Sequence, residues 1–207
     1  MPLNSNQAVI IHFESKNPIL CSIKNNSVDN FFSVELLNEI SLNINKGDPV
    51  VVGMIKNNNI EALGGSVVSI NSNNEIIKSM IIVADNKNVP NEKRKHVRIP
   101  ISLYGVISAN NMVVAETCIK EISFSGIRIY THKELNIEEL FDIDLFLLNE
   151  IANFKCRIVR KSQRYGKKEY GLKIEHDDDS TLLVNKFIES IHNHHKMLIS
   201  SYLQNNM

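Results

Sequence analysis

The chain has 207 residues, of which 43% are hydrophobic and 22% charged, and its 23 Lys and Arg balance its 23 Asp and Glu. These ordinary globular proportions exclude disordered, fibrous and membrane-embedded classes, and a formal charge of zero disfavours a protein that tracks along nucleic acid. No apolar run approaches the ~18 residues of a membrane-spanning helix, and the N-terminus has no secretion signal. We therefore expect a cytoplasmic protein of two compact domains, each of roughly 100 residues.

The first part of the chain has the pattern of an all-β domain. Short β-branched runs alternate with Asn-rich turn clusters, and the runs cover residues 8–13, 18–23, 48–55, 62–70 and 75–83. Residues 28–40 are expected to form a strand followed by a turn or a short helix. The Gly64-Gly65 pair lacks the flanking residues of a phosphate-binding loop, so it predicts a bulge inside a strand.

A polar segment with one proline, residues 85–95, follows and is expected to connect two domains. Strand patterns then resume at six places, which start at residues 97, 112, 126, 140, 153 and 168. Six strands with short turns favour a small closed barrel. The predicted fold is mainly β, with two six-stranded barrels in tandem, residues 1–90 and 91–207, and a C-terminal α-helix.

The C-terminal helix is predicted from capping residues at Asp179 or Ser180 and from an apolar stripe at helical spacing that includes Val184 and Ile199. At about 24 residues it would be ~36 Å long, more than a small barrel needs as a cover, so its far end is available to a partner or to a second copy. Homo-oligomers are therefore left open.

No metal site is expected. Three histidines of the predicted helix are more consistent with a solvated face than with metal ligands, and they are His192, His194 and His195. Three cysteines lie far apart without ligand spacing and are expected as reduced core thiols: Cys21, Cys118 and Cys156.

The stretch "KRKHVRIPI" places Arg94 and Arg98 four residues apart, directly before an apolar run. All six arginines of the chain follow residue 90, and the planar guanidinium fork suits phosphates and guanine edges. The stretch "EISFSGIRI" begins 23 residues after Arg98 and places Ser123 and Gly126 in SxxG spacing. Together with "RIVR", "YGLKI" and a closing helix, these motifs over residues 91–203 resemble the PilZ domain, a cyclic di-GMP receptor module. The preceding β unit resembles the N-terminal domain of YcgR-like flagellar brake proteins.

This resemblance implies a set of ligand-binding residues. Cyclic di-GMP carries two phosphates and two guanines, which arginine forks can grip and stack on. The resemblance assigns guanine and phosphate contacts to Arg94 and Arg98, a flanking position to Lys93, and a polar turn around one base to Ser123 and Gly126, where a side chain would block close approach. Secondary candidates are Arg160 and Gly171.

One residue departs from the motif. The family motif is [D/N]xSxxG, and the resemblance implies that the short side chain of its first Asp or Asn accepts a hydrogen bond from guanine. Here that position is Glu121, whose extra methylene displaces the carboxylate by on the order of 1 Å. The resemblance implies a receptor that changes its interdomain arrangement and controls motility or surface polysaccharide through a protein partner. Glu121 keeps open an adaptor that binds partners without nucleotide. A single-strand nucleic-acid barrel is the third alternative, from seven cations in residues 155–168. No motif indicates an enzyme.

Overall fold

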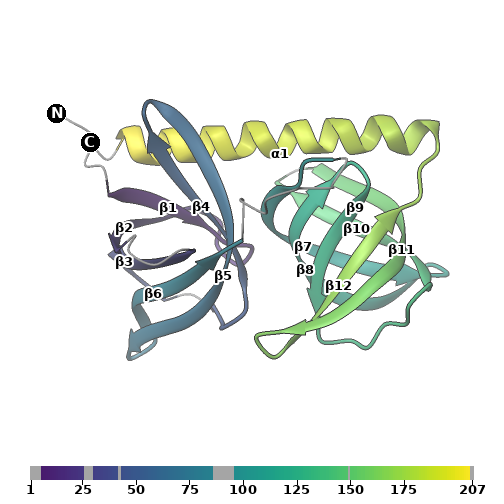
Figure 1. The fold of residues 1–207 in the computed structure, drawn as a ribbon, viewed down its shortest axis with the longest axis horizontal. Helices are drawn as coiled ribbons and strands as arrows, with labels where there is room; N and C mark the ends of the chain where they lie inside the picture. The colour runs from purple at the N-terminus through teal and green to yellow at the C-terminus, as the bar shows by residue number, and fades with distance from the viewer. Residues whose placement is uncertain (1–5, 26–29, 42, 86–95, 149, 206–207) are drawn as a thin grey trace. The chain divides into compact units, whose positions relative to one another are not determined.

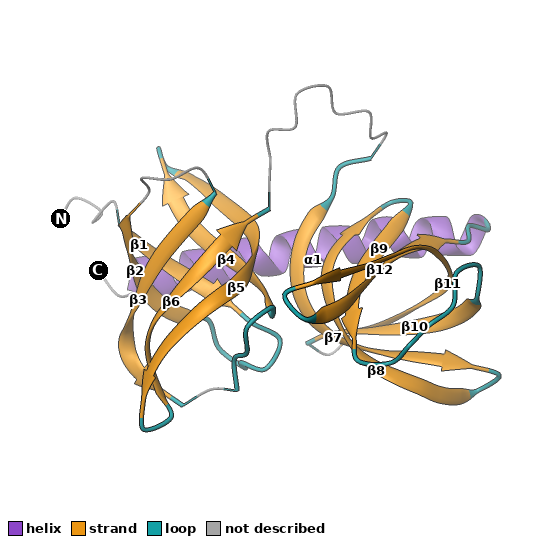
Figure 2. Cartoon of the chain, turned by 60° about the horizontal axis from the view of Figure 1, so that its bottom comes forward, coloured by secondary structure: helices purple, strands orange, loops and turns teal. Residues whose placement is uncertain are grey.

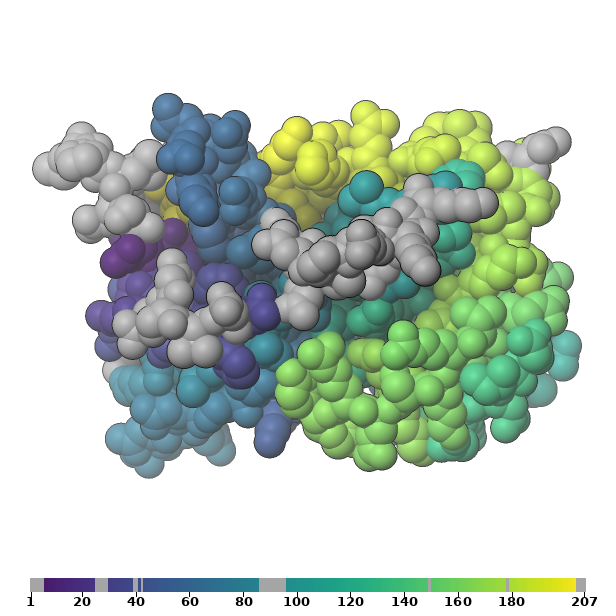
Figure 3. All heavy atoms as spheres, viewed as in Figure 1, coloured from purple at the N-terminus to yellow at the C-terminus, as the bar shows by residue number. Residues whose placement is uncertain are grey.

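The computed structural model describes residues 6–25, 30–41, 43–85, 96–148 and 150–205. The chain forms two compact units, Lys93–His192 and a unit that combines Met1–Glu92 with Asn193–Met207. The predicted domain boundary at 90/91 lies outside the described residues and stays a prediction. Figure 1 follows both units along the chain, and Figure 3 shows their packed atoms in the same colours.

The first unit contains a closed six-stranded barrel in the order β1-β2-β3-β6-β5-β4, in which β1 also pairs with β4. The strands are β1 (Gln7–Ile11), β2 (Ile19–Asn25), β3 (Phe31–Ile40), β4 (Pro49–Lys56), β5 (Asn59–Asn73) and β6 (Ile76–Ala84). Its core consists mainly of aliphatic side chains, including Ile10, Val52 and Ile82. The ambiguous segment 28–40 thus contributes a strand, and none of its described residues is helical.

The second unit contains another closed barrel, in the order β10-β11-β12-β9-β8-β7, in which β10 also pairs with β7. Its strands are β7 (Ile99–Ala109), β8 (Met112–Ser123), β9 (Gly126–Thr131), β10 (Leu140–Leu147), β11 (Glu150–Arg164) and β12 (Lys167–Ile174). They can be followed around the barrel in Figure 2. The predicted mainly-β fold with two barrels is confirmed. Along β9, Ile127 and Ile129 enter the core while Gly126 and Arg128 do not, as strand geometry requires.

Four two-residue hairpin turns have positive φ at both positions, the backbone geometry that matches strand twist. They are Asn57-Asn58, Asn74-Glu75, Asn110-Asn111 and Tyr165-Gly166. Asparagine tolerates this region better than most residues, which explains why the Asn-rich clusters mark the turns.

The glycine pair of β5 does not form the predicted bulge. Gly64 and Gly65 pair regularly with Val51 and Val50 of β4, and the irregularities of β5 fall later, after Val67. A Cβ on Gly65 would lie 2.9 Å from the carbonyl oxygen of Val83. The missing side chain therefore permits close approach of β5 and β6.

The single described helix, α1 (Asp178–Asn205), contributes to both units. Val184, Phe187 and Ile191 belong to the core of the second unit. Further along, Ile199 and Leu203 pack with strand residues of the first unit that include Val9 and Leu20. The far end of the helix thus packs against β-strands of its own chain. None of the described helices is long and apolar enough to cross a membrane.

Two details of α1 differ from expectation. The N-terminal cap is Asp177, whose Oδ1 accepts a 2.7 Å hydrogen bond from the Ser180 amide, while the Ser180 hydroxyl accepts one from the Asp177 amide. The histidines do not all lie on a solvated face, because His195 is buried. Burial also lowers the pKa of His194.

The turn geometry makes a matched pair of stability predictions. Glu75 has φ of 66°, so Glu75→Gly should raise the free energy of unfolding by roughly 0.5–1 kcal/mol through relief of strain. Gly166 has φ of 80° and open space around its Cβ position, so Gly166→Ala should lower this free energy by about 1 kcal/mol. Urea unfolding measures both values. Equal stability of the two variants would contradict the assignment of strain to these turns.

Candidate ligand-binding site

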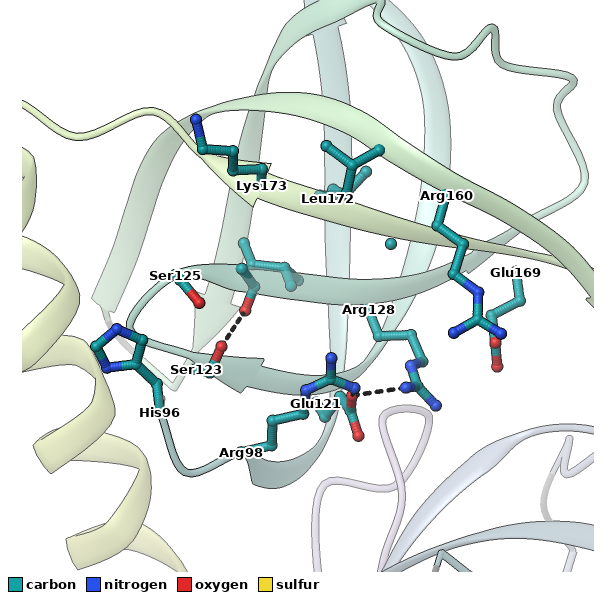
Figure 4. A pocket seen from close by; sticks show the side chains of 14 residues that line it. His96, Arg98, Glu121, Ser123, Ser125, Arg128, Arg160, Glu169, Leu172 and Lys173 are labelled. Atoms are coloured by element: carbon teal, nitrogen blue, oxygen red, sulfur yellow. Dashed lines mark hydrogen bonds and ion pairs between the residues drawn. The ribbon is translucent and has the colours of Figure 1, made fainter. Parts of the chain in front are cut away.

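A pocket of about 510 Å³ lies on the outer surface of the second barrel, over β8, β9, β11 and β12 (Figure 4). It is lined by fourteen residues: His96, Arg98, Glu121, Ser123, Ser125, Gly126, Ile127, Arg128, Val159, Arg160, Glu169, Gly171, Leu172 and Lys173. Neighbouring strand positions alternate between the core and the outer surface. Since Ile122, Ile127 and Leu172 belong to the core, the residues next to them in each strand face outwards to the pocket.

Strand register arranges much of the lining in a row across four strands. Glu121 of β8 lies opposite Arg128 of β9, Arg128 lies opposite Gly171 of β12, and Gly171 lies opposite Arg160 of β11. Since adjacent strands are about 4.8 Å apart, the backbones of the two arginines are separated by roughly 10 Å with a glycine between them. This row presents two cations on either side of an uncovered strip of backbone.

A register shift in β8 determines which side chain faces Arg128. Ile119 pairs with Ile129, but Glu121 pairs with Arg128, so Lys120 is the extra residue of the shift. In a regular β8–β9 pairing without this shift, Lys120 would lie opposite Arg128, and two cations would come together. The bulge instead places a carboxylate there, an example of an irregularity that re-aims a side chain beside a site.

Glu121 interacts with two arginines through one oxygen. Its Oε1 accepts a hydrogen bond from Arg98 Nη1 and lies 3.1 Å from Arg128 Nη2. The side chains of Glu121 and Arg128 are 13% and 19% exposed, whereas that of Arg98 is 35% exposed. Arg98 reaches this pair from residues 96–98, directly before β7, which we call the entry segment. The carboxylate therefore connects the entry segment to the barrel.

The SxxG turn is closed by its own residues. Ser123 is buried, and its hydroxyl donates a 3.2 Å hydrogen bond to the carbonyl oxygen of Gly126. A Cβ on Gly126 would lie 2.4 Å from the carbonyl oxygen of Leu172 in β12. The requirement for glycine therefore comes from close packing of β9 on β12, in addition to any approach of a ligand.

Aromatic contacts hold the entry segment beside the turn. The Phe124 ring stacks on His176 at 4.6 Å with an interplanar angle of 12°, and the His96 ring lies 5.0 Å from Phe124. His96 precedes Arg98 by two residues and also lines the pocket. Such ring pairs contribute about 0.5–1.5 kcal/mol beyond area burial, so they help to position Arg98.

A buried carboxylate adjoins the row. Glu169 is 7% exposed, and its Oε1 accepts a hydrogen bond from Ser162. Burial is the largest influence on this group and raises its pKa. The charge of Arg128, a hydrogen bond with Tyr130 and the charge of Lys120 outweigh burial, so the pKa of Glu169 lies below its ordinary value. Glu169 is thus a second anion that stabilises Arg128.

The lining as a whole is positively charged. Four cations, Arg98, Arg128, Arg160 and Lys173, face two carboxylates, Glu121 and Glu169, which leaves a formal charge of +2 with histidine neutral. Within the described ranges, the side chain of Arg160 is exposed and has no ion-pair or hydrogen-bond partner. The described residues contain no group of three His, Cys, Asp or Glu side chains that could hold a metal.

The pocket brings together six of the eight residues that the sequence analysis singled out: Arg98, Glu121, Ser123, Gly126, Arg160 and Gly171. Lys93 and Arg94 lie outside the described residues. Sequence reasoning missed Arg128, Glu169 and His96. Arg128 could have been found by strand alternation, because it follows Gly126 by two positions and therefore faces the same side of β9.

The cationic β11–β12 hairpin, considered above as a nucleic-acid surface, is partly neutralised. The carboxylate of Glu134 pairs with both Lys161 and Lys168. The nearby Arg157 pairs with Glu175 at 2.8 Å. These contacts leave fewer free cations on the hairpin than its sequence suggests.

Three solved structures resemble the chain over most of its length. It is 12% identical to the Bacillus subtilis inhibitor of motility MotI/DgrA over 92% of this chain and 96% of that chain, with a TM-score of 0.41. It is 10% identical to Escherichia coli YcgR, solved in complex with c-di-GMP, over 93% and 86%, with a TM-score of 0.44. It is 10% identical to MrkH of K. pneumonia in its c-di-GMP complex, over 93% and 90%, with a TM-score of 0.45. At these values no residue role is transferred.

None of the curated proteins matches the chain. A family model does match, that of the PilZ domain, and it covers residues 92–190. This range contains both the second barrel and every residue that lines the pocket. Likeness of the first barrel to the N-terminal domain of YcgR-like proteins stays a prediction. Residues 92–190 of this chain are a PilZ domain.

Proposed function

We propose that the chain is a receptor for cyclic di-GMP, which binds in the pocket on the PilZ barrel. The observation that carries this proposal is the charge of the pocket, where four cations and two carboxylates leave a formal +2 for a ligand with two phosphates. The family match supports the same ligand, because the PilZ domain is a receptor module for cyclic di-GMP. We expect no metal in this site.

The lining offers groups for each part of the ligand. Arginine forks donate paired hydrogen bonds to phosphate oxygens or to O6 and N7 of guanine. In this proposal Arg98 and Arg160 take such contacts, and Arg94 and Lys93 add two further cations next to Arg98 in sequence. Gly126 and Gly171 leave a strip of backbone on which a planar base can lie close.

We further propose that binding changes the arrangement of the two domains, and that the protein acts in the cytoplasm. Arg94 and Arg98 belong to the segment that joins β6 to β7, so a ligand that contacts them also restrains the chain between the domains. A protein partner from the flagellar motor or the polysaccharide machinery would respond to this change. The family resemblance supports such a partner without naming it.

A second candidate function is an adaptor that binds proteins without nucleotide. It is favoured by one observation, the pairing of Glu121 with Arg98, which places an anion of the protein itself on a guanidinium needed by the ligand. The two candidates differ in a single property, the binding of cyclic di-GMP.

The receptor proposal predicts a ligand-dependent rise in melting temperature. Ligand at ~100 times its dissociation constant adds about 2.7 kcal/mol, and each kcal/mol shifts the midpoint by roughly 2–4 °C in a protein of this size. Cyclic di-GMP should therefore raise the midpoint by several degrees, and Arg98→Ala or Arg94→Ala should remove most of the rise. Differential scanning fluorimetry measures these shifts.

Lys155 provides the control, because it is an exposed cation of β11 outside the pocket. Lys155→Ala should keep the full ligand-dependent rise. Without ligand, Arg98→Ala should melt near wild type, since Glu121 retains Arg128 as its partner. The removed side chain of Arg98 is 35% exposed, so solvent screening limits the contribution of its ion pair to about 1 kcal/mol. No rise in the wild type would favour the adaptor, and an equal rise in the arginine variants would place the ligand elsewhere.

The proposed domain rearrangement predicts a change in solution scattering. Saturating cyclic di-GMP should lower the radius of gyration and slow amide hydrogen exchange over residues 91–98, because the ligand restrains the connecting segment. Arg98→Ala at the same ligand concentration is the control. Identical scattering and exchange with and without bound ligand would contradict the rearrangement while leaving binding intact.

A further inference from the structure

We propose that Arg128 is a further ligand-binding arginine, and that Glu121 is an internal counter-ion of Arg98 and Arg128 which a ligand phosphate replaces. This inference rests on the proposed function and concerns the same pocket. It assigns to Glu121 a role different from the guanine contact that the motif's first position implies.

The shared oxygen is the first step of the argument. Glu121 Oε1 accepts from Arg98 Nη1 and lies 3.1 Å from Arg128 Nη2, so the carboxylate lies between two guanidinium groups (Figure 4). Each arginine is permanently charged and donates in a fork that matches carboxylate and phosphate alike. A phosphate that takes these donors must therefore compete with the carboxylate.

The second step is the position of Arg128. Strand pairing fixes it between Glu121 and Gly171, and Gly171 in turn lies opposite Arg160. Gly171 has no side chain to fill the space between the two arginines. An anion over Gly171 can thus be approached from one side by Arg160, which has no ion-pair partner in the described ranges, and from the other by Arg128.

The third step concerns what remains after the exchange. When a phosphate takes Arg98 and Arg128, the Glu121 carboxylate loses both of these arginine partners and must turn towards solvent or a donor of the ligand. The Glu121 side chain is only 13% exposed, so the loss of both partners leaves a mostly buried carboxylate unpaired. Ligand binding has to offset the free energy that this loss costs. Glu121 therefore lowers the affinity of the pocket, and removal of its charge should raise the affinity.

Glu121→Gln separates this role from a guanine contact, because it keeps the length of the side chain and removes its charge. As a counter-ion, Glu121 weakens binding, and Glu121→Gln should tighten the dissociation constant for cyclic di-GMP by about fivefold. As an acceptor for guanine, the carboxylate strengthens binding, and the same variant should bind more weakly. Arg128→Ala should weaken binding by about tenfold or more through loss of charge-assisted hydrogen bonds.

The chain offers a matched control in Glu134, a carboxylate outside the pocket that pairs with two cations, Lys161 and Lys168. Glu134→Gln should leave the dissociation constant unchanged. Calorimetric titration with cyclic di-GMP measures all variants, and melting without ligand shows that each is folded. Glu121→Ala is a second charge-removing variant for the case in which Glu121→Gln does not fold.

The outcomes distinguish this inference from the proposed function. Wild-type binding that Glu121→Gln leaves unchanged or weakens would overturn the counter-ion role while the receptor stands, and unaltered binding by Arg128→Ala would overturn the assignment of Arg128. Binding by Glu121→Gln but not by the wild type would support the counter-ion and refute the receptor. Absence of binding in every variant would refute both.

Discussion

The carboxylate of Glu121 between two arginines is the interaction on which the chemistry of the pocket depends. Arg98 and Arg128 would repel each other without it, and both are partly removed from water. The shared oxygen neutralises one positive charge and holds two guanidinium groups at fixed positions. Donors that are held in position lose less conformational entropy when a ligand binds. The donors of Arg98 and Arg128 are, however, already paired with Glu121. The same contact thus organises the site and competes with its ligand.

The barrel provides the rigidity that this contact requires. Glu121, Arg128, Gly171 and Arg160 lie on four adjacent strands. The core residues next to the first three, Ile122, Ile127 and Leu172, are buried. Sites on regular strands are positioned more accurately than sites on loops. Among the described lining residues, His96 and Arg98 come from the segment before β7, and the contact of Arg98 with Glu121 connects this segment to the row. The strands therefore determine most of the pocket, and the entry segment completes it.

Local chemistry made much of this structure predictable from sequence. Asparagine pairs marked hairpin turns because few other residues tolerate positive φ, and alternating β-branched runs marked the strands. The resemblance of the RxxxR and SxxG motifs to the PilZ domain predicted a shared site for Arg98 and Ser123. Both residues line the pocket, and their contact with a ligand stays a prediction. What the sequence did not show depends on register. The pairing of Glu121 with Arg128 arises from the extra residue Lys120, and no local pattern indicates where a strand will shift by one.

The helix illustrates the same limit. Its apolar stripe predicted burial but could not indicate the partner, which for Ile199 is the surface around Gly53 of β4. Gly126 was assigned to ligand approach, yet the structure shows a second cause in the carbonyl oxygen of Leu172. In both cases a residue far away in sequence decides the role, and one-dimensional patterns do not contain that information.

Calorimetric titration of the wild-type protein with cyclic di-GMP tests the central claim most directly, with GTP and cyclic AMP as controls. A pocket with two net positive charges, arginine forks and a glycine floor predicts saturable binding of cyclic di-GMP and much weaker binding of the two controls. The affinity should fall as salt increases, because phosphates meet partly exposed arginines. Absence of saturable binding at low salt, or equal binding of all three nucleotides, would contradict the account.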